Sequence, residues 1–210
     1  MNKNLYMKKI GEKAKIASLN LSNLSINKKN SVLRQFIQYL KKNEKLILNA
    51  NKKDISNARS KNIKNSMIDR LKLDSKKIKQ IRNSIKKIIL FKDHVVKTLS
   101  SWKRPNGLII KRESIPIGII GVIYESRPNV TSDVASLCFK SGNVVILKGG
   151  SEAINSNKAL AKLFRKALKK VNCHPAYVQL PQKHKKRIAW SYVMIELAQT
   201  GRKKLEQKSD

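Results

Sequence analysis

The fold class is decided by residues 115–150, IPIGIIGVIYESRPNVTSDVASLCFKSGNVVILKGG. The apolar runs at 115–124 and 144–147 are typical of strands, and the second is apolar throughout, as in a strand buried on both faces. Between them, residues 130–140 predict a helix, with Asn129 or Thr131 as its candidate cap. The stretch therefore predicts two strands joined by a helix.

The same alternation continues downstream of this stretch. Leu160, Leu163, Phe164 and Leu168 mark an amphipathic helix, and residues 177–180 begin a third apolar run. Strands that alternate with helices in this way form a parallel sheet. We therefore predict an α/β fold with part of a doubly wound sheet.

The residues upstream predict helices, because apolar side chains recur there at helical spacing. Asp74 or Ser75 is a candidate cap of the second helical stripe. A turn cluster at 103–107, KRPNG, ends this region. We expect residues 1–180 to form one unit, helical to about 100 and β/α from about 108, and 181–210 to be a divergent basic tail. The two stripes consist of Val32, Leu33, Phe36, Ile37 and Leu40, and of Ile78, Ile81, Ile85, Ile88 and Ile89.

Two turns, YESRPN and KGGSEA, follow the first two strands of the predicted sheet. Ligands of open α/β sheets bind beyond the carboxyl ends of the strands. In the second turn, Lys148, the small residues Gly149 and Gly150, and a helix that opens with Ser151 and Glu152 predict a phosphate site. The alternative is a tight turn that carries a surface lysine.

The first turn contains Arg127 and Asn129 on either side of Pro128. An arginine can bind a carboxylate or phosphate through two parallel hydrogen bonds, and an asparagine can donate to a developing oxyanion. The alternative is a surface pair between Arg127 and Glu125, with Asn129 as a helix cap.

The formal net charge of +34 suggests a nucleic-acid-binding protein as an alternative function. However, aromatic residues are not interleaved with the basic runs, and no zinc-finger or RNA-binding motif is present. We expect no specific nucleic-acid partner. We also expect no metal, because the cysteines and histidines are not clustered. No window approaches the roughly 18 apolar residues that a membrane span requires, and the N-terminal residues lack the apolar core of a signal peptide. We expect a cytoplasmic protein without a membrane partner.

Three segments identify a family. Residues 104–157, RPNGLIIKRESIPIGIIGVIYESRPNVTSDVASLCFKSGNVVILKGGSEAINSN, closely resemble γ-glutamyl phosphate reductase, also called glutamate-5-semialdehyde dehydrogenase, and so do ANKKDISNAR and MIDRLKLD upstream. The resemblance covers roughly residues 5–180. It implies an aldehyde-dehydrogenase-like fold, NADPH as cofactor, and reduction of L-glutamyl 5-phosphate to L-glutamate 5-semialdehyde in proline biosynthesis. It also implies that the intact enzyme is a homo-oligomer.

The resemblance assigns roles to the strand-end turns. Lys148 matches the lysine that contacts the adenosine ribose or its 2′-phosphate, and Gly149, Gly150, Ser151 and Glu152 lie where cofactor contacts are usual. Asn129 resembles the asparagine of the oxyanion hole in the aldehyde dehydrogenase superfamily. However, the number of residues between the GVI strand and Asn129 differs from the pattern of that superfamily. Arg127 is expected to bind an anionic group of substrate or cofactor.

The resemblance also implies a missing group, the catalytic cysteine thiolate that attacks the acyl carbon. Cys138 matches a cysteine on a non-catalytic helix, and Cys173 precedes the catalytic region. We therefore expect a truncated N-terminal part of the enzyme that lacks the catalytic domain and is inactive alone. The alternatives are a cofactor-binding remnant without catalysis and a basic nucleic-acid-binding protein.

Overall fold

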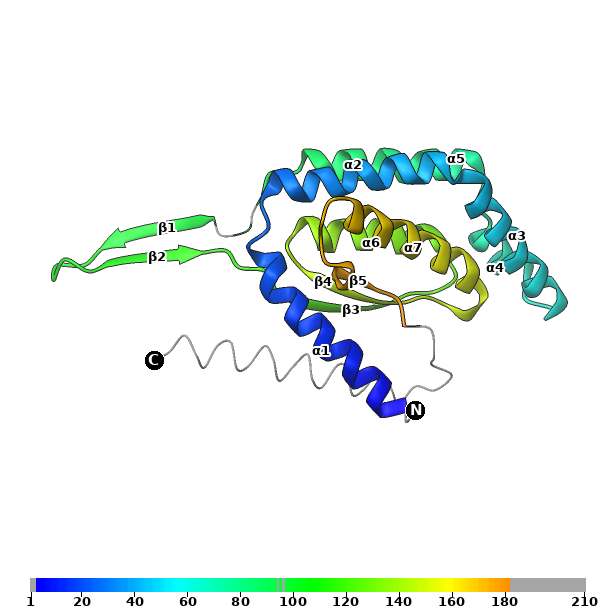
Figure 1. Ribbon diagram of the computed structural model, residues 1–210, viewed down its shortest axis with the longest axis horizontal. Coiled ribbons are helices and arrows are strands. Elements are labelled where there is room, and N and C mark those ends of the chain that lie inside the picture. The colour runs from blue at the N-terminus through cyan, green and yellow to red at the C-terminus, as the bar shows by residue number, and fades with distance from the viewer. Residues whose placement is uncertain (1–2, 94, 96, 182–210) are drawn as a thin grey trace.

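A three-stranded parallel sheet lies at the centre of the protein (Figure 1). The structure is a computed structural model that describes residues 3–93, 95 and 97–181. The strands are β3 (Ile119–Ile123), β4 (Val144–Lys148) and β5 (Val178–Gln179), in the order β3-β4-β5. The first four residues of β4 are fully buried, as the continuous apolar run predicts. The predicted parallel sheet is thus confirmed.

Helices cover the sheet in layers. The crossover helices α6 (Pro128–Lys140) and α7 (Ile154–Lys170) pack on β4 and β5, and α1 (Lys3–Ser22) packs against β3 and β4 (Figure 1). Crossovers between parallel strands are right-handed, and in the order β3-β4-β5 both crossovers run in the same direction across the sheet. The two crossover helices, α6 and α7, therefore lie on the same face of the sheet. Gln179 Nε2 donates to the carbonyl of Ile10 at 3.3 Å and ties β5 to α1.

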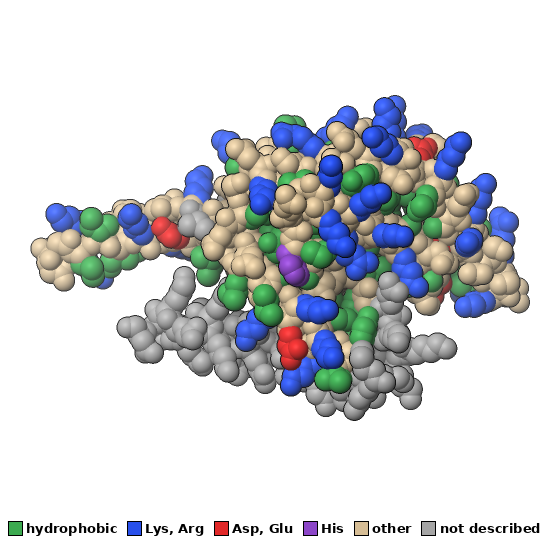
Figure 2. Space-filling view, in the orientation of Figure 1, with side chains coloured by type: hydrophobic (Ala, Val, Ile, Leu, Met, Phe, Trp, Pro, Cys, Tyr) green, Lys and Arg blue, Asp and Glu red, His purple; other side chains and the backbone are tan. Residues whose placement is uncertain are grey.

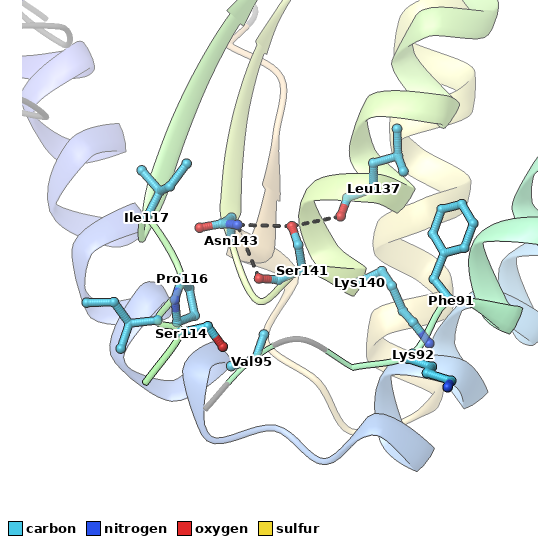
Figure 3. A pocket seen from close by; sticks show the side chains of 11 residues that line it. Phe91, Lys92, Val95, Ser114, Pro116, Ile117, Leu137, Lys140, Ser141 and Asn143 are labelled. Carbon is cyan, nitrogen blue, oxygen red and sulfur yellow. Dashed lines mark hydrogen bonds between the residues drawn. The ribbon is translucent and has the colours of Figure 1, made fainter. Parts of the chain in front are cut away.

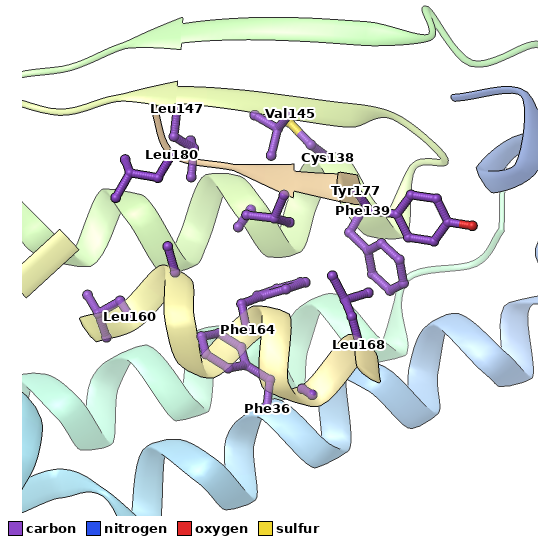
Figure 4. Packing of buried hydrophobic residues seen from close by; sticks show 14 of the residues in the cluster. Phe36, Cys138, Phe139, Val145, Leu147, Leu160, Phe164, Leu168, Tyr177 and Leu180 are labelled. Atoms are coloured by element: carbon purple, nitrogen blue, oxygen red, sulfur yellow. The ribbon is translucent and has the colours of Figure 1, made fainter. Parts of the chain in front are cut away.

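An outer layer of helices lies over α6 and α7. It contains α2 (Ile26–Lys42), α3 (Glu44–Ser60), α4 (Asn65–Leu71) and α5 (Ser75–Leu90). Both predicted apolar stripes face inward, and the ring of Phe36 of α2 packs at a tilt against that of Phe164 of α7, with 4.7 Å between ring centroids (Figure 4). Asp74 caps α5, because its side chain accepts from the amide of Lys77 at 2.6 Å.

A two-stranded arm projects from this body (Figure 1). Its antiparallel strands are β1 (Thr98–Lys103) and β2 (Ile109–Glu113). The helical region therefore ends at Leu90, and a strand begins at Thr98, slightly before the predicted limit of about 100.

Two boundaries near the sheet differ from the prediction. The strand expected over 115–124 begins only at Ile119, since Pro116 has no N–H for a ladder and Gly118 has a φ of 109°. Short 3₁₀ turns, η1 (Ser151–Ala153) and η2 (Pro175–Tyr177), precede α7 and β5. The predicted tail at 181–210 lies outside the described residues except for its first position. Among the described helices, none has the length and apolar character to cross a membrane.

Candidate functional site

The two strand-end turns meet at one edge of the sheet, as predicted. Ile123, the last residue of β3, pairs with Lys148, the last residue of β4, and the amide of Tyr124 donates to the carbonyl of Lys148 at 2.9 Å. Beyond the strands, the hydroxyl of Ser126 donates to Oε2 of Glu152 at 3.0 Å. The turns YESRPN and KGGSEA therefore contact each other, and we refer to the two turns together as the strand-end surface.

Glu152 is the charged centre of this surface. Its carboxylate accepts from the hydroxyls of Ser126 and Ser151, the latter at 3.1 Å. Partial burial raises its pKa, but hydrogen bonds from its own backbone amide and from the two serines outweigh burial, so that the pKa lies below the ordinary value. Glu152 is therefore an anion at neutral pH. It stands in the same turn as the half-buried Lys148, with which that turn begins.

The two glycines of KGGSEA serve the packing of the protein itself. A Cβ atom on Gly149 would overlap the side-chain amide of Asn157 and lie 2.9 Å from the ring of Tyr124. A Cβ atom on Gly150 would crowd the carboxylate of Glu152. The sequence predicts that both glycines allow the close approach of a ligand, whereas neighbouring side chains lie where the added Cβ atoms would be.

One part of the phosphate-site prediction is wrong, because α7 does not open with Ser151 and Glu152. Ser151 and Glu152 belong to η1, and α7 begins only at Ile154. Asp54 of α3, which is 1% exposed, accepts from the backbone amides of Asn155 at 3.0 Å and Ser156 at 2.7 Å. A carboxylate of the protein therefore occupies the positive end of the helix, where an anion would otherwise bind.

Sequence reasoning overlooked Asp54, although a signal existed. Ile47, Asn51, Asp54 and Ala58 of α3 are buried at helical spacing, so two polar residues stand in an otherwise apolar stripe. Asn51 donates to the carbonyl of Leu71 and to the hydroxyl of Ser156. Polar residues on a buried stripe indicate an internal hydrogen-bond network.

The first turn also differs from expectation. Arg127 is the N-cap residue of α6 without a side-chain cap bond, and Asn129 and Thr131 do not cap the helix. Asn129 Nδ2 donates to Oδ2 of Asp133 at 3.2 Å, one turn further along α6. Glu125 lies 3.8 Å from Arg70 of α4, so that Arg70 is its ion-pair partner in place of Arg127, the partner in the alternative interpretation of this turn. Arg127 is exposed.

Asn129 and Asp133 line a groove that the sequence did not predict. The groove has a volume of about 460 Å³ and lies where α6 faces α4 and α5. Its cations are Arg70, Lys72 and Lys77. Burial raises the pKa of the Asp133 carboxyl, against the lowering effect of the hydrogen bond from Asn129. Oδ1 of Asp133 is buried and has no hydrogen-bond partner within the described part of the chain.

Neither cysteine has the environment of a catalytic thiolate in this structure. Cys138 is buried in the core beside Phe139 (Figure 4), and burial raises the pKa of its thiol to about 11. Burial also raises the pKa of Cys173. A catalytic thiolate needs a lowered pKa and access to substrate. Among the described residues, no group of three or more His, Cys, Asp or Glu could hold a metal ion.

A second cavity lies at the opposite, amino-terminal edge of the strands (Figure 3). It has a volume of about 300 Å³ and a mainly apolar lining that includes Phe91, Pro116 and Ile117. The side chain of Asn143 accepts from the amide of Gly118 at 2.8 Å and donates to Ser141, so that it clamps the loops. Among the described residues that line this cavity none is acidic, which distinguishes it from the strand-end surface.

The chain matches known proteins over part of their length. The gamma-glutamyl phosphate reductase of Nitratiruptor sp. is 49% identical over 159 residues, which are 76% of this chain and 39% of that protein. The gamma-glutamyl phosphate reductase of Clostridium perfringens is 43% identical over 195 residues, which are 93% of this chain and 46% of that protein. The latter match necessarily extends past residue 180 of this chain. No protein-family model matches the chain.

Solved structures agree with these relatives. The crystal structure of gamma-glutamyl phosphate reductase from Thermotoga maritima is 39% identical, with a TM-score of 0.81 over 83% of this chain and 42% of that chain. An acetylating aldehyde dehydrogenase from Geobacillus thermoglucosidasius, 12% identical, has a TM-score of 0.67 over 91% of this chain and 39% of that chain and shares the fold. The expected resemblance and the aldehyde-dehydrogenase-like fold are confirmed, and the chain spans less than half the length of the curated relatives it matches.

Proposed function

Because the chain is homologous to part of the gamma-glutamyl phosphate reductases, we propose that it serves the NADPH-dependent reduction of L-glutamyl 5-phosphate to L-glutamate 5-semialdehyde, in proline biosynthesis in the cytoplasm. The observation that carries the proposal is the identity of 43–49% with these reductases. The chain contributes the cofactor-binding surface and part of the substrate surface. The thiolate must come from elsewhere, because Cys138 and Cys173 are buried and have raised pKa values.

The strand-end surface suits the adenosine ribose of NADPH. Lys148 supplies a cation for the ribose or its 2′-phosphate. Glu152, held as an anion by its serine donors, accepts from ribose hydroxyls, and Ser151 is exposed beside it. Gly149 and Gly150 shape this turn through their packing. The bound dinucleotide supplies the hydride, and these residues bind and orient it.

The first turn suits the acyl group and its phosphate. The amide of Asn129 has two N–H donors and gives one to Asp133. The other can donate to the oxygen that gains charge when the acyl carbon is attacked. Arg127 is exposed at the start of α6 and can bind the departing phosphate or another anionic group.

The projecting arm supports a homo-oligomer. All six residues of β1 are exposed, and a two-stranded hairpin has little stability alone. Leu99, Trp102, Leu108 and Ile109 are between 45% and 60% exposed, and Figure 2 shows apolar side chains along the arm. An apolar surface of this kind is typical of a protein interface. A second copy of the chain is the proposed partner.

Titration of the 210-residue chain with NADPH and NADH, followed by calorimetry, tests the cofactor assignment. We expect NADPH to bind, and Lys148→Ala to weaken NADPH by about tenfold, since a hydrogen bond to a charged group contributes about 1.5–3 kcal/mol. The same substitution should weaken the binding of NADH less, because NADH lacks the 2′-phosphate. Lys170→Ala, an exposed lysine at the last position of α7, is the matched control.

A folded chain that binds neither dinucleotide at millimolar concentration would contradict the cofactor assignment. Formation of NADPH from glutamate 5-semialdehyde, phosphate and NADP⁺ should not occur with this chain alone. Turnover by the purified chain would show that the thiolate assignment is wrong.

A further inference from the structure

The groove beside Asn129 contains charged side chains of both signs, and within the described residues its cations form no ion pair with Asp133. Asp133 receives one hydrogen bond, from Asn129, although a carboxylate can accept about four. Its Oδ1 atom is buried without a partner within the described residues. Burial raises the pKa of the Asp133 carboxyl, and the hydrogen bond from Asn129 opposes this shift.

The cations of the same groove lie apart from Asp133. Lys72 forms its ion pair with Asp69 at 2.7 Å, outside the groove lining. Lys77 donates one hydrogen bond, to the carbonyl of Lys72 at 2.6 Å, which leaves two of its three donors. Arg70, with a side chain that is 54% exposed, has a single carboxylate contact within the described residues, the long one with Glu125 at 3.8 Å. The groove thus has an anionic wall on α6 and a separate cationic wall on α4 and α5.

We infer that this groove binds the zwitterionic head of an amino-acid substrate, with Asp133 accepting from the α-ammonium group and Arg70 and Lys77 binding the α-carboxylate. A zwitterion is the ligand that matches two separated walls of opposite charge, because each of its groups compensates one wall. The volume of about 460 Å³ is in the range of small-molecule sites. This inference rests on the proposed function and names a substrate-binding part of the same site.

The position of Asp133 fits this role. Asn129, the proposed oxyanion donor, and Asp133 are joined side chain to side chain at 3.2 Å. A substrate with its acyl oxygen at Asn129 and its head in the groove would therefore extend along the first turns of α6. Asp133 is a specificity residue in this arrangement, and it does not take part in the chemical step.

Binding of L-glutamate and glutarate to the 210-residue chain tests the inference, because the two probes differ by the α-ammonium group. We expect L-glutamate to bind at least about tenfold more tightly than glutarate, as the loss of one charge-assisted hydrogen bond implies. Asp133→Asn should abolish this preference, since asparagine still accepts from Asn129 but no longer carries a charge. Lys77→Met should weaken both probes and keep their ratio. Asp69→Asn, outside the groove, is the control and should keep the wild-type ratio.

Equal binding of the two probes, or no binding of L-glutamate by the folded wild-type chain, would overturn the inference. An unchanged ratio in Asp133→Asn would overturn the role of Asp133. If Asp133→Asn does not fold, the comparison of the probes on the wild-type chain still decides. Binding of NADPH is measured in parallel: NADPH binding without a preference for L-glutamate refutes this inference alone, and a preference for L-glutamate without NADPH binding refutes the cofactor assignment alone.

Discussion

Ser126 and Glu152 lie on different strand-end turns, and the hydroxyl of Ser126 donates to Oε2 of Glu152 at 3.0 Å. Ser126 is 5% exposed, so that water competes little for this bond. The bond fixes the carboxylate next to Gly150, in the space that a Cβ atom of that residue would need. The proposed cofactor surface is therefore held together by a contact between two turns rather than by either turn alone.

Ser126→Ala should lower the free energy of unfolding by about 1–3 kcal/mol, because it removes a hydrogen bond to a charged group. The folded-state pKa of Glu152 lies below its unfolded value, so its contribution to stability is present above the unfolded pKa and is lost as pH falls through the folded pKa. Urea unfolding at pH 7 and at pH 3 measures both effects. The difference between wild type and Ser126→Ala should be smaller at pH 3, and an equal difference at the two pH values would contradict the charged bond.

Asp54→Ala should destabilise the protein strongly. The Asp54 carboxylate accepts from two backbone amides and from the side chains of Asn155 and Ser156, in a site that is 1% exposed. Removing it leaves buried donors unpaired, and we expect a loss of about 3–5 kcal/mol in unfolding free energy.

The control for this substitution is Asp69→Ala, because Asp69 forms an exposed pair with Lys72. Such exposed pairs contribute little to stability, because solvent screens the attraction between the two charges. If the two substitutions had equal effects in urea unfolding, Asp54 would not be the anchor of α7.

Gly149→Ala should destabilise the protein by about 1–3 kcal/mol, the usual cost of inserting an atom into a packed site. The added methyl group would overlap the amide of Asn157 and touch the ring of Tyr124. Gly11→Ala is the matched control. A Cβ atom on Gly11 meets no atom within 4 Å, and this glycine lies inside α1. We expect Gly11→Ala to stabilise by about 0.5–1 kcal/mol, because alanine favours helices. Thermal unfolding of both variants gives the comparison.

The sheet and its helices could be predicted from the sequence because burial leaves a pattern there. The run VVIL of β4 is buried at every position, and Asp74 caps α5 with its own side chain. The first strand of the arm leaves no such pattern. It has the sequence TLSSWK and is exposed throughout, so that no alternation of apolar and polar residues marks it. Its pairing with β2 depends on backbone bonds, which any sequence can form.

The candidate site was predictable only in part, for a related reason. Lys148 is the last residue of an apolar strand, and Arg127 and Asn129 follow a few residues after another, so local sequence places them at the sheet edge. Asp54 accepts hydrogen bonds from Ser156, which lies more than 100 positions away in the sequence. Asp133 faces a groove whose cations come from α4 and α5. Contacts between distant segments have no local signature, and only the fold brings them together.

The thiols should be unreactive in the folded protein. Burial raises the pKa of Cys138 to about 11 and also raises that of Cys173, so that few thiolates exist at pH 7. A colorimetric thiol reagent should react with neither cysteine in native buffer and with both in guanidinium chloride. Rapid reaction of one native thiol would identify a candidate nucleophile and contradict its assigned place in the core.

Asp133→Asn should raise the stability of the chain at neutral pH. Burial raises the folded-state pKa of Asp133 above its unfolded value. The folded state then binds the proton more tightly, and the ionised carboxylate lowers stability as pH rises through the unfolded pKa. Asparagine removes this charge and keeps an acceptor for Asn129. The midpoint of thermal unfolding should therefore increase at pH 7, and the gain should vanish as pH falls below the ordinary aspartate value of 3.8.

This measurement also separates a structural from a functional role for Asp133. A residue that only supports the fold should lose stability when it is replaced. A gain in stability at pH 7, together with loss of the preference for L-glutamate over glutarate, would show that the buried charge serves a ligand at the expense of the fold. A lower unfolding midpoint of Asp133→Asn at pH 7 would instead mean that the carboxylate stabilises the fold through an internal partner.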